Sequence, residues 1–258
     1  MSHLIHCLPA LEDNYIWLIQ ANDSADTIIV DPGDGLLVQQ YITQHALKPV
    51  AIFITHGCYD HIMGIDALIQ HSPIPVYGPA NEVIPHCSHP LSAPCELTLP
   101  HFAPIKVLSL PGHTIGHLGY HLGQQLFSGD VLFAGGCGVI RAGRYQQGYA
   151  SLMQIAALAD DTLVYYSHEY TQSNLLFGRQ VEPDNTAIQQ RLTTVLNTSG
   201  PTLPTSLAIE HETNPFLRCH HPAVQQAAEQ HAGRPLQDSL AIFTVLRQWK
   251  NGFNAPSP

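Results

Sequence analysis

The sequence predicts an α+β protein in which two sheets pack face to face with helices outside, followed by a smaller helical segment. Short runs rich in β-branched and aromatic residues predict strands at 14–20, 27–31, 50–55, 105–110, 117–123 and 162–167. Helical patterns lie between them at 35–47, 62–71 and 149–159. Some of the strands alternate polar and apolar residues and others are wholly apolar, which is typical of packed sheets covered by helices.

The C-terminal third has a different pattern. From about Tyr170 onward, apolar residues recur at helical spacing and strand signals disappear. Proline-rich connectors such as "GPTLPTS" separate the helical stretches. We therefore predict an α+β domain at 1–169 and a helical domain at 170–258.

Charge and composition exclude several classes of protein. The net charge of −10 argues against a nucleic-acid partner. No apolar run reaches the roughly 18 residues that span a bilayer, and the N-terminus lacks the pattern of a signal peptide. The six cysteines form no CxxC pair and are interpreted as reduced thiols. We expect a soluble, cytoplasmic protein with no membrane partner, and a monomer.

The basic residues are unevenly distributed along the chain. Only Lys48 and Lys106 lie in the first 138 residues, and all the others lie from Arg141 onward. A substrate that carries carboxylates would therefore depend on the C-terminal part of the chain for its cations.

Metal-ligand residue types follow four of the apolar runs. A lone histidine after a strand is more often an ordinary polar residue, but four clusters in the same position are harder to explain that way, because loops after strands present side chains from a rigid scaffold. The residues are His56, Cys58, Asp60 and His61 after "VAIFIT", His113 after "IKVLSLPG", Asp130 after "QQLFSG" and His168 after "TLVYYS". Imidazole and carboxylate are ligands for Zn²⁺ or Fe²⁺, and two such ions can share a carboxylate and activate water.

The motifs that contain these residues resemble a known superfamily. "THGCYDH", "GHTIGH", "FSGD" and "SHEYT", in this order, are similar to the metallo-β-lactamase superfamily, whose loop pattern is HxHxDH. "GGCG" and "NPFLR" narrow the resemblance to glyoxalase II, the hydroxyacylglutathione hydrolases. The resemblance spans nearly the whole chain. It implies an αββα sandwich with a small C-terminal helical domain, and hydrolysis of S-D-lactoylglutathione to D-lactate and glutathione in methylglyoxal detoxification.

The resemblance also implies a set of metal ligands. One divalent ion would be bound by the metal-1 set, which is His56, Cys58 and His113. A second would be bound by the metal-2 set, which is Asp60, His61 and His168. Asp130 would bridge the two ions, a hydroxide that bridges the ions would be the nucleophile, and Asp60 and Asp130 would be the catalytic residues. Zinc, iron or both would occupy the site, and manganese is also compatible.

Cys58 departs from the loop pattern, which has histidine at this position. A thiolate could replace the histidine as a ligand, because a Zn–S bond of about 2.3 Å is longer than a Zn–N bond of about 2.0 Å. Alternatively, His56, His113 and Asp130 could hold a single Fe²⁺ for oxygen chemistry, as in the persulfide dioxygenases of the same superfamily. A third interpretation is a weakly active or non-catalytic metal-binding protein. The sequence leaves these three open.

Residues for binding the substrate are implied by the same resemblance. Arg218 in "NPFLR" matches an arginine that holds a glutathione carboxylate, and Tyr170 in "HEYT" matches a tyrosine that hydrogen-bonds the glutathione backbone. After "GCG" the family has a basic residue, where this chain has Val139, with Arg141 two positions later. His221 stands where a lysine is common. We expect weaker glutathione binding, because a lost charged contact costs about 1–3 kcal/mol.

Overall fold

Two six-stranded sheets form the centre of the molecule in the computed structural model, which describes residues 3–70 and 73–253. The first sheet has the strand order β1-β2-β3-β4-β5-β6, with β1 to β3 antiparallel and β3 to β6 parallel. Its strands are β1 His3–Ala10, β2 Asn14–Ala21, β3 Asp26–Val30, β4 Lys48–Phe53, β5 Val76–Pro79 and β6 His89–Leu91.

The second sheet has the order β14-β13-β10-β9-β8-β7. Only β10 and β13 pair in parallel, and the other neighbours are antiparallel. Its strands are β7 Cys95–Leu97, β8 Ile105–Ser109, β9 Leu118–Leu122, β10 Gln125–Gly129, β13 Leu163–Tyr166 and β14 Thr205–Ser206, and a separate small hairpin consists of β11 Leu132–Phe133 and β12 Gly136–Cys137. Because two antiparallel pairings separate β8 from β10, the strands β8, β10 and β13 run in the same direction.

Both faces of the sheets are buried, because successive side chains of a strand point to opposite faces. Trp17 of β2 lies in the core between the sheets, whereas its neighbour Leu18 lies in the core under the outer helices. Phe53 and Tyr120 connect the two sheets by stacking with ring centroids 4.6 Å apart. The wholly apolar strands of the sequence are therefore the strands covered on both sides.

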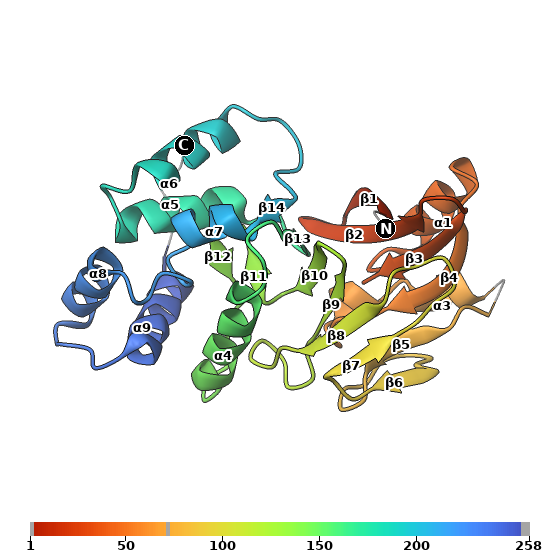
Figure 1. Cartoon of the computed structure of the whole chain (residues 1–258), viewed down its shortest axis with the longest axis horizontal. Helices are drawn as coiled ribbons and strands as arrows, with labels where there is room; N and C mark the ends of the chain where they lie inside the picture. Colours follow the sequence, from red (N-terminus) through yellow and green to blue (C-terminus); the bar gives the residue numbers. More distant parts are fainter. Residues whose placement is uncertain (1–2, 71–72, 254–258) are drawn as a thin grey trace.

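Helices cover the two outer faces (Figure 1). Val38, Ile65 and Leu68 pack on the first sheet from α1 Gly35–Gln44 and α3 Ile65–Ile69, which follows the short α2 Tyr59–Ile62. On the side of the second sheet lie α4 Tyr145–Ala156, α5 Thr171–Val181, α6 Thr186–Leu196, α7 Leu207–Thr213, α8 Pro222–Ala232 and α9 Ser239–Asn251. Asp34, Asn185 and Asp238 cap the first turns of α1, α6 and α9 with their side chains.

The predicted fold class is confirmed, but some predicted elements differ. The helix expected at 62–71 is two short helices, because the Gly64 N–H donates to Pro32 O at 2.8 Å and the chain turns there. Residue 71 itself lies outside the described residues. The helix expected at 149–159 begins at Tyr145 and ends at Ala156. No strand was predicted for β1, β5, β6, β7, β11, β12 or β14, and the helix α7 was not predicted.

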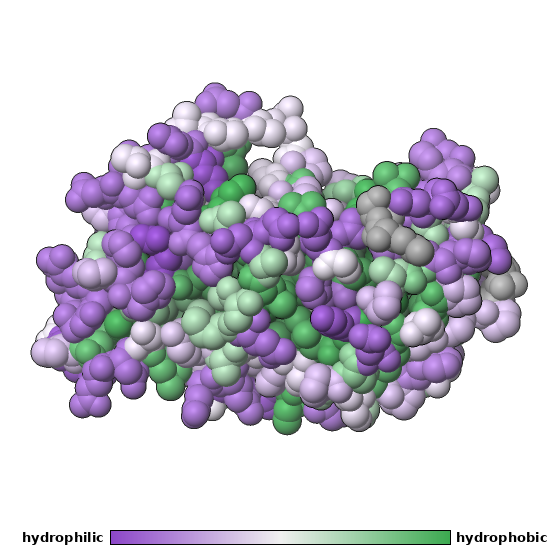
Figure 2. All heavy atoms as spheres, in the orientation of Figure 1, coloured by the Kyte–Doolittle hydropathy of each residue, from purple (hydrophilic) through white to green (hydrophobic). Residues whose placement is uncertain are grey.

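The helical segment shares its core with the second sheet. Leu126 and Val164 of that sheet belong to the same buried cluster as Phe177, Phe216 and Phe243 of the helices. The outer surface of the helices is largely hydrophilic in the face shown in Figure 2, so their apolar residues turn inward. Within the described residues, no helix is long and apolar enough to cross a membrane. The predicted boundary near residue 170 thus crosses a continuous core.

Because this core is continuous, we expect the sheets and helices to unfold together. Phe243→Ala should lower the free energy of unfolding by about 3–5 kcal/mol, the usual cost of removing a buried phenylalanine ring. Trp17 in β2 and Trp249 in α9 can report separately on the two parts, in Trp249→Phe and Trp17→Phe backgrounds respectively. Denaturant titrations followed by fluorescence should give coincident transitions, whereas two separated transitions would contradict a shared core. Leu196→Ala is the control, because that side chain is 51% exposed.

Candidate metal centre

The predicted ligands come together at the carboxyl ends of the strands. His56 follows β4, His113 follows β8, Asp130 follows β10 directly, and His168 follows β13. Asp60, His61 and Cys58 come from α2 and the residue before it. Their ligand atoms form three groups, each with all its atoms within 4.8 Å of one another: His56, Cys58 and His113; His56, His61 and Asp130; and Asp60, His61 and His168. The first and third groups are the predicted metal-1 and metal-2 sets.

Asp130 lies between these two sets. Its Oδ2 is 4.0 Å from His56 Nε2 and 3.6 Å from His113 Nε2. Its Oδ1 is 3.5 Å from His61 Nε2 and 3.4 Å from His168 Nε2. Each carboxylate oxygen therefore faces a different pair of imidazoles, which is the arrangement that a bridging ligand needs.

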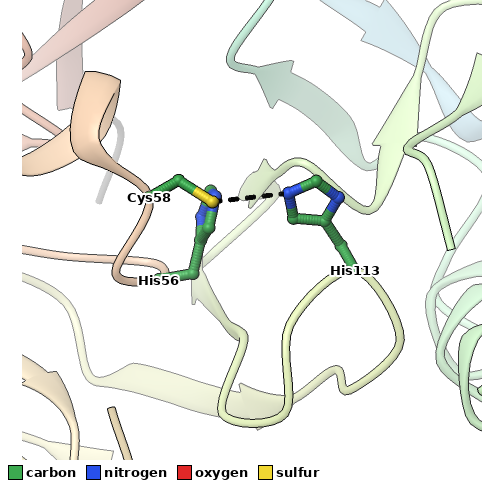
Figure 3. A group of neighbouring side chains, drawn as sticks. All are labelled: His56, Cys58 and His113. Carbon is green, nitrogen blue, oxygen red and sulfur yellow. Dashed lines mark hydrogen bonds between the residues drawn. The ribbon is translucent and has the colours of Figure 1, made fainter. Parts of the chain in front are cut away.

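The remaining two donors complete one set each. Cys58 Sγ lies 3.7 Å from His113 Nε2, and Figure 3 shows the sulfur pointing to that ring with His56 beside it. Asp60 Oδ2 lies 3.4 Å from both His61 Nε2 and His168 Nε2. The thiol thus occupies the same place in the metal-1 set that the Asp60 carboxylate occupies in the metal-2 set.

Several of these atoms lack a hydrogen-bond partner within the described part of the chain. They are His56 Nε2, His61 Nε2 and Asp130 Oδ1, all of them buried. A buried polar atom without a partner is costly, and such atoms are rare in folded proteins. Divalent cations would satisfy all three at once, so the donors present fit metal ions.

Each imidazole is held by its other nitrogen. The Nδ1 atom of His56, His61, His113 and His168 is bonded, at 2.7–3.0 Å, to Thr55 Oγ1, Asp31 Oδ2, Val139 O and Asp13 Oδ1 respectively. Every Nε2 is therefore directed to the centre, and partners of this kind orient metal ligands. The Asn14 side-chain amide holds Asp60 Oδ2 in the same way at 2.8 Å.

These supporting residues were not identified from the sequence. Asp31 accepts hydrogen bonds from the Thr55 backbone N–H and from the Thr55 hydroxyl, both at 2.7 Å, in addition to contacting His61. It belongs to the segment "DPGDG", whose Asp, Pro and Gly residues are typical of a turn. The available signal was its position, because Asp31 directly follows the wholly buried strand β3, as the candidate metal ligands follow other strands.

The centre carries an ionised carboxylate in a buried position. Burial alone would raise the pKa of Asp130, but His61 and His168 reverse this and hold it well below its usual value. For His61 burial has the opposite effect and acts to lower the pKa, but the charges of Asp130 and Asp31 outweigh it and hold this pKa well above its usual value. Burial raises the pKa of the Cys58 thiol. Coordination to a cation would remove its proton.

Two of the predicted substrate-binding residues lie beside this centre. The Tyr170 ring stacks on the His168 ring, with centroids 5.1 Å apart and planes 1° apart, and is 38% exposed. Arg141 is exposed, and its charge acts to lower the pKa of Cys58, although less strongly than burial raises it.

The other two predicted substrate-binding residues lie at the far end of α5. Arg218 donates from Nε and Nη2 to Glu182 at 2.8 and 2.9 Å, and His221 Nδ1 lies 3.5 Å from the same carboxylate. Glu182 follows the C-terminus of α5 and Tyr170 precedes its N-terminus. This 11-residue helix is about 16 Å long at 1.5 Å per residue. The role predicted for Arg218 and His221 stays a prediction.

Two further cations, not singled out from the sequence, contact segments near the centre. Arg247 is buried and donates to Cys137 O at 2.6 Å. Cys137 lies two residues before Val139, whose backbone O contacts His113 Nδ1. Lys250 donates to Ser173 O at 2.9 Å in the first turn of α5, and burial lowers its pKa to about 8. Their spacing on α9 places both on one helix face.

Comparisons with known proteins identify the family. Residues 169–253 match the family described as "Hydroxyacylglutathione hydrolase C-terminus", and residues 11–94 match the metallo-beta-lactamase superfamily. The hydroxyacylglutathione hydrolase of Nitrosomonas eutropha is 48% identical, with 95% of this chain and 96% of the relative covered. That of Alkalilimnicola ehrlichii is 46% identical, with 96% and 98% covered. The chain belongs to the hydroxyacylglutathione hydrolase family.

A solved structure agrees with the fold of this family. The crystal structure of TTHA1623 in a di-iron-bound form has a TM-score of 0.60 at 24% identity, and the match covers 82% of this chain and 100% of that chain. The resemblance stated from the motifs is thereby confirmed for family and fold. For a hydroxyacylglutathione hydrolase with this buried donor cluster, the centre is a divalent-metal site.

Asp31 should be required for tight metal binding in this chain. Asp31→Asn replaces the oxygen that holds His61 Nδ1, and loss of such a partner typically weakens metal affinity about 10–100-fold. Competition with a chelator, read as metal retained per chain, measures the effect. Asp66→Asn is the matched control, because Asp66 pairs with His86 at 2.7 Å on the exposed surface. Equal retention in both variants would contradict the role of Asp31.

Proposed function

We propose that this chain hydrolyses 2-hydroxyacylglutathione thioesters, with S-D-lactoylglutathione as substrate and D-lactate and glutathione as products. Membership of the hydroxyacylglutathione hydrolase family supports the reaction class. The observation that carries the proposal is Asp130, whose two oxygens face two separate sets of donors. A single ion held by His56, His113 and Asp130 would use only the Oδ2 side of this carboxylate and would leave Oδ1, with His61 and His168 beside it, without a cation.

We propose that two divalent ions occupy these sets, zinc, iron or both, with manganese also compatible. When bound, such ions activate water near neutral pH and polarise a thioester carbonyl. The residues that would hold them are His56, Cys58 and His113 for metal 1, Asp60, His61 and His168 for metal 2, and Asp130 for both. The di-iron state of a protein with the same fold is consistent with this number of ions.

The protein groups around the centre would bind and orient the thioester. Burial raises the pKa of Tyr170, so its hydroxyl stays protonated at neutral pH and can donate a hydrogen bond to the glutathione backbone. Arg141 supplies a positive charge near Cys58. Val139 is 55% exposed beside His113 and offers only an apolar surface where the family has a cation. We therefore propose a weaker grip on glutathione at this edge.

Several cations could hold the carboxylates of glutathione. The pairing of Arg218 with Glu182 neutralises its charge and occupies one edge of the guanidinium. Lys250 and Arg247 are better placed, because they contact the first turn of α5 and the segment before Val139. The negative charge of the chain makes an anionic substrate dependent on such local cations.

The setting of the reaction is also a proposal. All six cysteines are free thiols, which fits a reducing compartment such as the cytoplasm. We propose that the enzyme acts as a monomer on a small molecule, without a nucleic-acid or membrane partner.

Hydrolysis of S-D-lactoylglutathione tests the proposed activity directly. Zinc-loaded and iron-loaded protein should consume the thioester with a turnover number in the ordinary enzyme range of about 1–10³ s⁻¹. Loss of thioester absorbance is the measurement. Oxygen uptake with glutathione persulfide and no thioester loss would instead indicate a mononuclear iron dioxygenase. The absence of both reactions in metal-loaded protein would indicate a non-catalytic metal-binding protein.

Cys58 is proposed as a ligand of metal 1. Its sulfur lies with the His56 and His113 nitrogens in one group of potential ligand atoms, and thiolate is a good ligand for zinc and iron. The thiolate adds a negative charge to the metal-1 set, and this charge would make that ion a poorer Lewis acid than one held by a third imidazole.

Cys58→His should therefore raise kcat, by up to roughly tenfold, which corresponds to about 1.4 kcal/mol of barrier. Cobalt-loaded protein gives an independent readout, because a thiolate ligand produces a charge-transfer band in the near ultraviolet. The band should be present in the unmodified chain and absent in Cys58→His and Cys58→Ser. Unchanged activity with unchanged metal content, or no band in the unmodified chain, would contradict ligation by Cys58.

A further inference from the structure

We propose that Glu82 is a positioning residue for metal 1, because its carboxylate ties together the two loops that carry Cys58 and His113. Glu82 lies in the segment after β5 and belongs to none of the potential metal-ligand groups among the described residues. The inference rests on the proposed two-metal site and assigns a role to a residue outside it.

The two oxygens of Glu82 bond to different loops. Oε2 accepts the backbone N–H of Gly57 at 2.6 Å, and Gly57 directly precedes Cys58. Oε1 accepts the backbone N–H of Gly116 at 2.7 Å and also the hydroxyl of Thr114, which directly follows His113. Hydrogen bonds to an ionised carboxylate are about twice as strong as neutral ones. One side chain thus fixes the distance between the two loops.

The glycines at these two positions allow the close approach. A Cβ atom on Gly57 would lie 3.1 Å from Glu82 Oε2 and 3.3 Å from Val83 O. A Cβ atom on Gly116 would lie 2.1 Å from Asn81 Oδ1 and 2.9 Å from Glu82 Oε1. A side chain at Gly116 would displace the Asn81 and Glu82 side chains, and one at Gly57 would crowd the same carboxylate. Both loops are therefore shaped to bring their backbone N–H groups onto Glu82.

The connection matters for metal 1 in particular. The metal-2 residues His61, His168 and Asp60 are held by Asp31, Asp13 and Asn14 respectively. None of these three touches Cys58 or His113 through a hydrogen bond in the described structure. His113 is anchored through its Nδ1 to Val139 O, and the Cys58 side chain makes no capping bond at the start of α2. Glu82 is the group that links the backbone on both sides of the 3.7 Å separation between Cys58 Sγ and His113 Nε2.

Substitutions at Glu82 should weaken metal 1 and leave metal 2 unchanged. Glu82→Gln keeps the length of the side chain but places an NH₂ group against an N–H or O–H donor. Glu82→Asp keeps the charge but is one methylene too short to reach both loops. For both variants we expect about 10–100-fold weaker binding at metal 1. Thr114→Val removes only one of the three hydrogen bonds and should give a smaller effect in the same direction. The matched control is Glu96→Gln, at an exposed position on β7.

Cobalt titration of the metal-free protein separates the two sets. The thiolate charge-transfer band of Cys58 reports metal 1, because the metal-2 set contains no sulfur, and the visible absorption of cobalt reports both. In Glu82→Gln and Glu82→Asp, more cobalt should be needed to produce the ultraviolet band, because binding at metal 1 is weaker. The part of the titration in which the visible absorption rises without the ultraviolet band reports metal 2, and its affinity for cobalt should equal that of the unmodified chain. Thermal unfolding of the metal-free proteins checks that each variant is folded. If the Glu82 variants are not folded, the same titration is carried out with Thr114→Val.

The outcomes distinguish this inference from the proposed function. If the unmodified chain binds one ion or shows no thiolate band, the proposed two-metal site with Cys58 as ligand is wrong. The role inferred for Glu82 is then wrong as well. If the unmodified chain binds two ions but the Glu82 variants bind cobalt as tightly in both phases, only the positioning role is overturned. Equal weakening of both phases also overturns it, because that result indicates general damage to the fold.

Discussion

The buried carboxylate of Asp130 is the constraint around which the centre is organised. It is only 8% exposed, and four imidazole nitrogens lie within 4.0 Å of its oxygens. An anion in such a place is unfavourable unless positive charge or hydrogen-bond donors surround it. Histidine rings supply both in part, and divalent cations supply the charge fully. The fold brings these groups together because β8, β10 and β13 run in the same direction and end at one edge of the second sheet. The end of β4, in the first sheet, lies opposite this edge.

Rigidity around Asp130 comes from groups that never reach the centre. Asp31 illustrates this, since one carboxylate holds both the Thr55 backbone and the His61 ring. The Thr55 hydroxyl in turn contacts the His56 ring, so both histidines of this loop, His56 and His61, depend on Asp31, the residue directly after β3. Buried networks of this kind have few alternative arrangements, because a half-satisfied member is costly. The candidate metal-binding side chains are therefore held in place by protein groups.

The sequence was sufficient to single out the candidate metal-binding residues but not the residues that hold them in place, for a physical reason. His56, His113, Asp130 and His168 follow apolar runs, and this local pattern is visible without a fold. The contact between Asp13 and His168 joins residues 155 apart in sequence, and that between Glu82 and Gly57 joins residues 25 apart. Nothing in the spacing of these acids marks them as different from turn formers. The break between α2 and α3 was missed likewise, because it depends on the Gly64 N–H finding Pro32 O rather than a helical partner.

The replacement of a histidine by Cys58 also changes the balance between the two sets. With a thiolate at this position, the metal-1 set has two imidazoles and one anion, and so does the metal-2 set with His61, His168 and Asp60. Asp130 is shared by both. A third imidazole would instead leave metal 1 with one negative charge fewer than metal 2. As the proposed ligand, Cys58 would make the two sets nearly equal in charge but unequal in softness. Because soft thiolates favour zinc and iron over manganese, the sulfur would favour zinc or iron at metal 1 and would leave metal 2, with its nitrogen and oxygen donors, less selective.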